Sequence, residues 1–174
     1  MLIGKTLEDA MNRQIGSEFG ASLQYVSIAA YFEAEDLQQL AAFFFRQSDE
    51  ERMHAMKFVH YILDAGGQVR IPDIPASRYE FQSAEDAVQA ALDWEMEVTA
   101  QINNLMDIAR EENDYIAQNF LQWFVAEQLE EVSTMSTLLN IVRRAKDNLL
   151  LVEEYLARNP DPHAGQANGG AAGE

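Results

Sequence analysis

The sequence predicts an all-α protein: a four-helix bundle with a long crossover loop and a short fifth helix at the C-terminal end. Four segments carry apolar residues at steps of three and four along one face, which is the period of an amphipathic helix. None of the four contains a proline, whereas Pro72 and Pro75 fall between the second and the third segment. The first and second segments, and likewise the third and fourth, are separated by very short connections, so each pair should form an antiparallel hairpin.

The first hairpin joins apolar stripes at residues 7–32 and 37–65. Residues 34–36, Ala-Glu-Asp, leave room only for a tight turn between two helices. Gly66 and Gly67 should end the second helix, because glycine readily adopts the left-handed conformation that closes a helix.

A crossover of about eighteen residues follows, and at roughly 3.3 Å per residue it could span a helix of about 28 residues with a rise of 1.5 Å each. The extended length of the crossover does not by itself decide whether the segment runs the length of the bundle. Ser83 is the expected N-cap of the third helix, whose stripe covers residues 84–109. The fourth stripe covers 117–145, and residues 112–114, Glu-Asn-Asp, form the second turn.

The C-terminal part is expected to contain a fifth helix at about 147–158, which is apolar on most sides and therefore needs a surface to cover. The bundle with this helix makes one domain, residues 1–158. Residues 159–174, NPDPHAGQANGGAAGE, are small and glycine-rich, and they predict a disordered tail.

Charge and composition exclude several classes of function. The formal net charge of −17 over 174 residues argues against direct binding to nucleic acid or to an anionic membrane, since phosphate binding needs cationic side chains. The chain has no cysteine, so it has no disulfide, thiolate cluster or catalytic thiol, and any metal must be held by oxygen and imidazole ligands. Without a signal-peptide pattern or a membrane-length apolar run, a cytoplasmic protein is expected.

One spacing occurs in both hairpins. Glu18 is followed 33 residues later by Glu51, and His54 comes three residues after that. The second hairpin repeats these intervals with Glu95, Gln128 and Glu131. Residues equidistant from a hairpin tip stand at the same height on adjacent antiparallel helices. If the two hairpins pack stripe to stripe, all six side chains meet near the middle of the bundle.

Such a cluster needs cations. Burying an ionised carboxylate without a partner costs several kcal/mol, and adjacent carboxylates also repel each other. Two divalent cations would balance the four carboxylates, while His54 and Gln128 add neutral ligands. Bridging carboxylates with a single imidazole suit iron or manganese better than zinc. The sequence therefore predicts a two-metal site inside the bundle.

The residues around this site resemble the prokaryotic non-haem ferritins over about residues 5–158. The resemblance rests on the stretch from Glu18 to Tyr25, on residues 49–55 (DEERMHA), on Glu95, and on residues 120–131 (FLQWFVAEQLEE). It implies a ferritin-like bundle and a ferroxidase that oxidises Fe(II) with O2 or H2O2. It also implies a homo-oligomeric shell of twenty-four subunits that stores ferric mineral.

The resemblance also assigns ligands to two irons per subunit. One iron is held by Glu18, Glu51 and His54. Glu51 bridges to the second iron, which Glu95 and Glu131 hold with Gln128 alongside. A third iron site is implied by three adjacent acidic residues: Glu50, Glu127 and Glu130. These three could instead form a solvated acidic face.

Haem is not expected, because the position of the axial methionine in haem-containing relatives is Arg52 here. Tyr25 either supplies an electron during oxygen reduction or only packs in the core. Trp123 is interpreted as a packing residue. Glu112, Asp114 and Gln118 near the second turn are candidate pore residues by position alone.

Two other classes of function compete with iron storage. A metal-free helical interaction module would explain the helices but not buried acids at matched heights. A di-iron oxidase of small organic substrates would share the ligand chemistry. On the ferritin interpretation, a reductase or a ferredoxin is the candidate partner for iron release, and nucleic acid and membrane are not expected partners.

Overall fold

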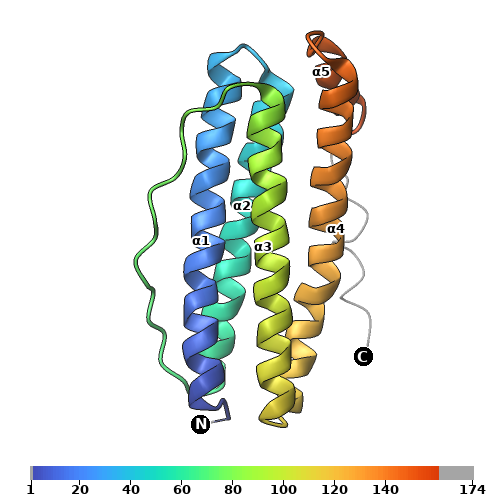
Figure 1. Cartoon of the computed structure of the whole chain (residues 1–174). Coiled ribbons are helices and arrows are strands. Elements are labelled where there is room, and N and C mark those ends of the chain that lie inside the picture. The colour runs from blue at the N-terminus through green and yellow to red at the C-terminus, as the bar shows by residue number, and fades with distance from the viewer. Residues whose placement is uncertain (1, 161–174) are drawn as a thin grey trace, which may run out of the picture.

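The computed structural model describes residues 2–160, and it confirms the predicted bundle (Figure 1). The four long helices are α1 (Lys5–Ala34), α2 (Gln38–Asp64), α3 (Ala84–Glu111) and α4 (Tyr115–Ala145). Helices α2 and α3 run in the same direction, opposite to α1 and α4, so only the link between α2 and α3 must cross the bundle. The short helix α5 (Leu150–Arg158) follows α4 at the same end as the α1–α2 turn.

Helix ends lie where the sequence predicts them. At the two hairpin turns, Asp36 has φ 59° and Asn113 has φ 55°, a left-handed conformation that these two residue types tolerate better than most. Gly66 adopts φ 76° just after α2. Ser83 is the N-cap of α3, and its hydroxyl accepts a hydrogen bond of 3.1 Å from the backbone N–H of Asp86.

The crossover runs along the outside of α1 for the length of the bundle, which settles the question that reach alone left open (Figure 1). Two buried amide side chains of α1 hold it in place. Asn12 donates to the carbonyl of Gln68 at 3.0 Å and accepts from the N–H of Arg70 at 2.5 Å. Gln24 donates to the carbonyl of Arg78 at 2.9 Å and accepts from its N–H at 2.8 Å. Each amide therefore satisfies both polar groups of extended backbone that has no sheet partner.

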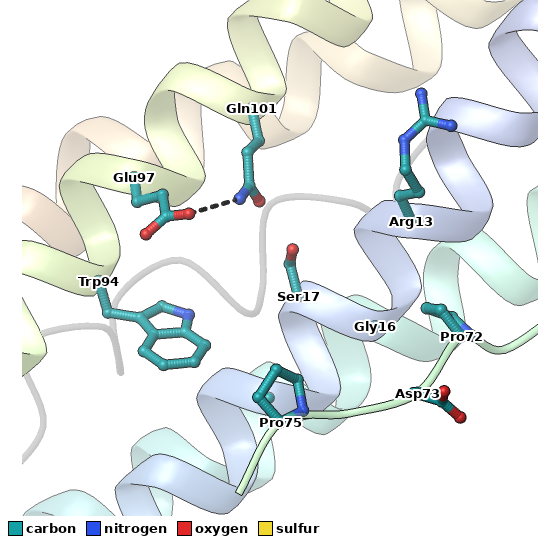
Figure 2. A pocket seen from close by; sticks show the side chains of 10 residues that line it. Arg13, Gly16, Ser17, Pro72, Asp73, Pro75, Trp94, Glu97 and Gln101 are labelled. Carbon is teal, nitrogen blue, oxygen red and sulfur yellow. Dashed lines mark hydrogen bonds between the residues drawn. The ribbon is translucent and has the colours of Figure 1, made fainter. Parts of the chain in front are cut away.

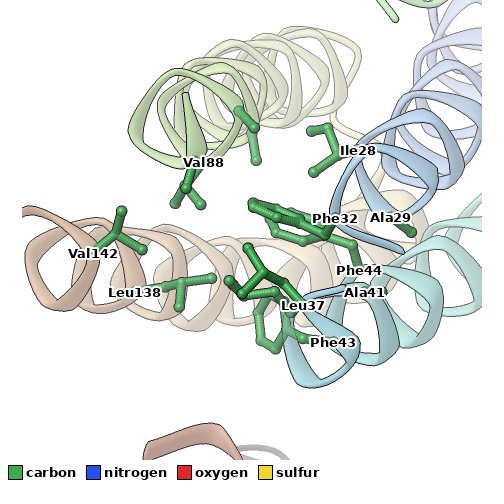
Figure 3. Close-up of a cluster of buried hydrophobic side chains, with 14 of the residues drawn as sticks. Ile28, Ala29, Phe32, Leu37, Ala41, Phe43, Phe44, Val88, Leu138 and Val142 are labelled. Carbon is green, nitrogen blue, oxygen red and sulfur yellow. The ribbon is translucent and has the colours of Figure 1, made fainter. Parts of the chain in front are cut away.

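The buried apolar side chains form two clusters, one toward each end of the bundle. The first surrounds the α1–α2 turn and α5, and Figure 3 shows Phe32, Phe44, Val88 and Leu138 converging there from all four long helices. The second surrounds the α3–α4 turn and includes Phe58. Their buried members leave a gap on every long helix, at residues 16–20, 45–54, 92–97 and 125–134. These four gaps lie at one height and define what we call the polar layer.

Helix α5 is fixed to the bundle by apolar and polar contacts. Val152 and Leu156 are buried in the first apolar cluster. The carboxylate of Glu153 accepts hydrogen bonds from the backbone N–H groups of Gln39 (2.8 Å) and Leu40 (2.9 Å), which lie in the first turn of α2. Glu153 thus supplies the cap that α2 lacks at its own N-terminus. No helix in residues 2–160 is both long enough and apolar enough to cross a membrane.

Candidate metal centre

All six residues with the repeated spacing lie in the polar layer. Helices α1 and α3 contribute one side chain each, and α2 and α4 contribute two each. Every one is buried, with exposures from 0% for Glu131 to 4% for Gln128. The fold therefore brings these side chains together, and their role as metal ligands remains a prediction. The six are Glu18, Glu51, His54, Glu95, Gln128 and Glu131.

Their oxygen and nitrogen atoms are close enough to share metal ions. Glu18, Glu51 and His54 place one ligand atom each within 4.8 Å of one another. Glu51, Glu95 and Glu131 do the same. Glu51 belongs to both groups, as a carboxylate that bridges two ions would. The arrangement can accommodate two cations side by side.

Two of the four carboxylates are oriented by neutral donors. Gln14, one turn before Glu18, donates a hydrogen bond of 2.9 Å to its Oε1. Glu95 accepts from the Tyr25 hydroxyl through Oε1 and from the Gln128 amide through Oε2, the latter at 3.1 Å. Neutral hydrogen bonds fix the direction of a carboxylate but leave its negative charge uncompensated. The carboxylates of Glu18 and Glu95 are therefore oriented by their neighbours but still need a positive charge to balance their own.

Of the remaining carboxylate oxygens, Oε2 of Glu51 lies 3.3 Å from Nδ1 of His54, and the other four have no hydrogen-bond partner within the described chain. Oε2 of Glu18, Oε1 of Glu51 and both oxygens of Glu131 are buried without one. Leaving a buried acceptor unpaired costs about 1–3 kcal/mol, and more when it is charged. Cations bound among these atoms would pair all of them at once. The donor set, carboxylate oxygen with one imidazole, fits iron or manganese.

Protonation of the layer follows from burial and charge. Burial raises the pKa of each of the four carboxyls. For Glu51 and Glu131 the nearby charge of Glu95 adds to this effect, and the pKa of each lies well above its usual value. Burial acts to lower the pKa of His54, but the carboxylates of Glu51 and Glu127 outweigh it, so that pKa is raised well above its usual value. Divalent cations would take the place of these protons.

One residue of the expected third site, Glu127, lies beside His54. Glu127 lies 3.7 Å from Nε2 of His54 and forms a third group of ligand atoms with His54 and Glu131. Glu50 accepts a hydrogen bond from the amide of Gln47. The group that contains Glu127 includes neither Glu50 nor Glu130, so the third site remains a prediction.

Aromatic side chains border the layer on two sides. Tyr25 is fully buried and bonded to Glu95, and burial raises its pKa well above the usual value, so its hydroxyl keeps its proton. Its role as an electron donor remains a prediction. Trp123 packs edge-on against His54 with ring centroids 5.4 Å apart, and the ammonium of Lys57 lies 4.2 Å from its ring. The interpretation of Trp123 as a packing residue agrees with these contacts.

Two supporting residues are absent from the set predicted by sequence. Gln14 orients Glu18, and Thr99 accepts a hydrogen bond of 3.2 Å from Gln128 while its own hydroxyl donates to the carbonyl of Glu95 at 2.7 Å. Each lies four residues from a predicted ligand. A search for polar residues one helical turn away from the ligands would have found both.

Comparison with known proteins gives a consistent result. Residues 8–145 match the Ferritin-like domain. The chain is 47% identical to Ferritin BfrB of Mycolicibacterium smegmatis over 163 residues, which cover 91% of this chain and 90% of the relative. It is 36% identical to the bacterial non-heme ferritin of Staphylococcus aureus over 158 residues, covering 89% and 95%.

A solved structure agrees with this relationship. An open pore ferritin from the archaeon Archaeoglobus fulgidus superposes with a TM-score of 0.87 at 31% identity, and the match covers 90% of this chain and 97% of that one. The match to the domain covers most of the bundle, and the bacterial relatives exceed 30% identity across nearly their whole length. The chain therefore belongs to the ferritin family and is a prokaryotic ferritin.

Proposed function

We propose that this ferritin binds Fe(II) in pairs in the polar layer, oxidises it there and stores the product as ferric mineral. Membership of the family supports iron storage as the general role. The observation that carries the finer proposal is the set of buried carboxylate oxygens without hydrogen-bond partners, which belong to Glu18, Glu51 and Glu131. A protein without a metal would gain nothing from leaving these atoms unpaired.

Each residue of the layer has a distinct task in this proposal. Glu18, Glu51 and His54 bind one Fe(II), and Glu51 also binds the second together with Glu95 and Glu131. Gln14 and Tyr25 keep the carboxylates of Glu18 and Glu95 turned toward the metals through their hydrogen bonds. Preorganised ligands of this kind hold two ions close enough to react together with one oxidant molecule.

Electron and charge balance explain how the product leaves. Two Fe(II) ions each give one electron to O2, which takes up two protons and becomes H2O2; with H2O2 as oxidant, the same two electrons give water. The ion pair changes from four positive charges to six, while the two groups of ligand atoms that would hold it offer only four carboxylates. The excess charge favours hydrolysis of bound water and weakens retention of the pair. Fe(III) then passes to the mineral, and the site is free for new substrate.

The proposal extends to assembly and to iron release. A shell of twenty-four copies would enclose the mineral, and the net charge of −17 per chain would attract Fe(II) toward it. Glu50, Glu127 and Glu130 are proposed to bind a third iron next to the pair. Haem is not part of the proposal. A reductase or a ferredoxin would return electrons when iron is released.

The test is a double substitution, Glu51→Ala with His54→Ala, mixed with Fe(II) in air. We expect fast oxidation, followed as ferric absorbance, to fall to the rate in buffer alone, and particle size by light scattering to stay that of wild type. His60→Ala with Glu111→Ala is the matched control, because these residues are an exposed histidine and an exposed glutamate. Unchanged initial rates in the first variant would refute the assignment.

A further inference from the structure

We propose that the groove between α1 and α3 is the route by which Fe(II) reaches the polar layer from solution, with Gln14 as its inner gate. This inference rests on the proposed function, since it concerns the path of the substrate to the same site. It differs from the pore residues suggested by sequence, Glu112, Asp114 and Gln118, which lie near the α3–α4 turn. Its basis is a pair of clefts on one face of the subunit.

The two clefts adjoin each other. The first, of about 210 Å³, lies between α1, the crossover and α3. Figure 2 shows Ser17 of α1 and Gln101 of α3 on facing walls, with Trp94 toward one end and Arg13 toward the other. The second cleft, of about 470 Å³, continues along α1 and α3 and shares Arg13, Ser17, Glu97 and Gln101 with the first. The shared walls make one continuous groove.

Gln14 connects this groove with the metal centre. Its side chain lines the second cleft, yet the residue is only 3% exposed. Its amide nitrogen donates the 2.9 Å hydrogen bond to Oε1 of Glu18, whose other oxygen is unpaired. The amide side chain of Gln14 therefore links the groove to a buried carboxylate. Rotation of the Gln14 side chain would expose the Glu18 carboxylate to a cation in the groove.

The groove lining suits a hydrated divalent cation. Glu97 and Asp73 supply carboxylates, and Ser17 supplies a hydroxyl. The amide of Gln101 donates to Glu97 at 3.3 Å, while its carbonyl oxygen is buried without a partner. Hard cations take oxygen ligands of these kinds. At about 30 Å³ per water, the second cleft has room for an ion with its water shell.

Two other clefts of the described chain do not reach the site in this way. One lies between α2, α4 and α5 and includes Phe43 and Tyr155. Another lies between α2 and α4 and includes Lys57 and Trp123. Among the described residues, neither is lined by one that donates a hydrogen bond to Glu18, Glu51, Glu95 or Glu131. The α1–α3 groove is thus distinguished by its chemistry and by Gln14.

The experiment measures the rate of anaerobic Co(II) binding by stopped-flow absorbance and the initial rate of Fe(II) oxidation. Ala100→Trp should fill the second cleft and slow both rates about tenfold or more, with the final number of Co(II) ions per chain unchanged. Ala126→Trp, an exposed alanine of α4, is the matched control and should behave as wild type.

Two variants test the charge and the gate. Arg13→Glu should speed binding several-fold at low ionic strength and lose this gain in salt, because Arg13 repels cations at the groove. Gln14→Ala should also speed binding, since it removes the gate.

Rates that stay at the wild-type value in Ala100→Trp would overturn the proposed route, and so would an equal slowing in the Ala126→Trp control. A rate in Gln14→Ala at or below wild type would overturn the gate. Failure of wild type to bind Co(II) at all would instead count against the proposed function.

Discussion

The candidate ligands of the polar layer and the two apolar clusters are equally buried in the same four helices. The apolar side chains pack against one another, whereas some oxygen atoms of the ligands have no partner in residues 2–160. Phe44 has 0% exposure and Glu51 has 1%. Phe44 contacts three other aromatic rings, whereas one oxygen of Glu51 has no partner. Burial therefore does not reveal function here. Unpaired polar atoms in a buried layer do, because they mark where the fold depends on a ligand.

The largest expected change in stability comes from breaking an apolar cluster. Phe32→Ala removes a fully buried ring that stacks on Phe44, and we expect the free energy of unfolding to fall by about 3–5 kcal/mol. Leu23→Ala, at a half-exposed position of α1, should change it by less than about 0.5 kcal/mol. Chemical denaturation at fixed protein concentration measures both. A small loss in Phe32→Ala would mean that the cluster is less tightly packed than described.

The opposite result is expected in the polar layer. Glu131→Gln should stabilise the metal-free protein by on the order of 1–4 kcal/mol at pH 8, because it removes a buried charge whose oxygens have no partner. It should also weaken metal binding. The same substitution should therefore stabilise the metal-free protein and reduce the extra stability that bound metal provides. Melting curves with and without Co(II) give both quantities. Destabilisation of the metal-free form would contradict this view of the layer.

The effect of Glu131→Gln should depend on pH with a definite sign. Burial raises the pKa of Glu131 in the folded state well above the usual 4.5, so the folded state binds a proton that the unfolded state releases. This group's contribution to stability is complete below pH 4.5 and is lost as the pH rises through the folded pKa. The advantage of the glutamine variant should therefore grow from pH 5 to pH 8. A constant difference across that range would show that the pKa of Glu131 is not raised.

The smallest change is expected for Tyr25→Phe, which deletes one hydrogen bond to Glu95 and keeps the ring packing. The metal-free protein should lose about 1 kcal/mol of stability. Both Co(II) ions should still bind, because Tyr25 orients a ligand but is not one. Calorimetric titration checks the number of sites. Loss of one ion would give Tyr25 a larger part in the site than orientation.

Much of the fold could be predicted from the sequence because the relevant physics is local. Stripes of helical period, the Gly66 stop and the Ser83 cap each depend on a few neighbouring residues. The matched heights of Glu18 and Glu51 followed from counting residues on either side of a tight turn.

Contacts between distant segments could not be found in this way. The α1–α3 groove needs the packing of two helices and the crossover, and the cap that Glu153 provides for α2 joins residues more than a hundred positions apart. The hydrogen bond from Gln14 to Glu18 is local, but its meaning depends on the cleft behind Gln14. The sequence therefore predicts which side chains meet in the polar layer, but not the groove that lies beside them.

Anomalous X-ray scattering from crystals soaked in Fe(II) without oxygen would show whether the polar layer binds two metal ions. We expect two iron peaks per chain, about 3.5–4 Å apart. One should lie among Glu18, Glu51 and His54, and the other among Glu51, Glu95 and Glu131. Iron peaks only at the protein surface, with none in the polar layer, would show that the layer is not a two-metal site.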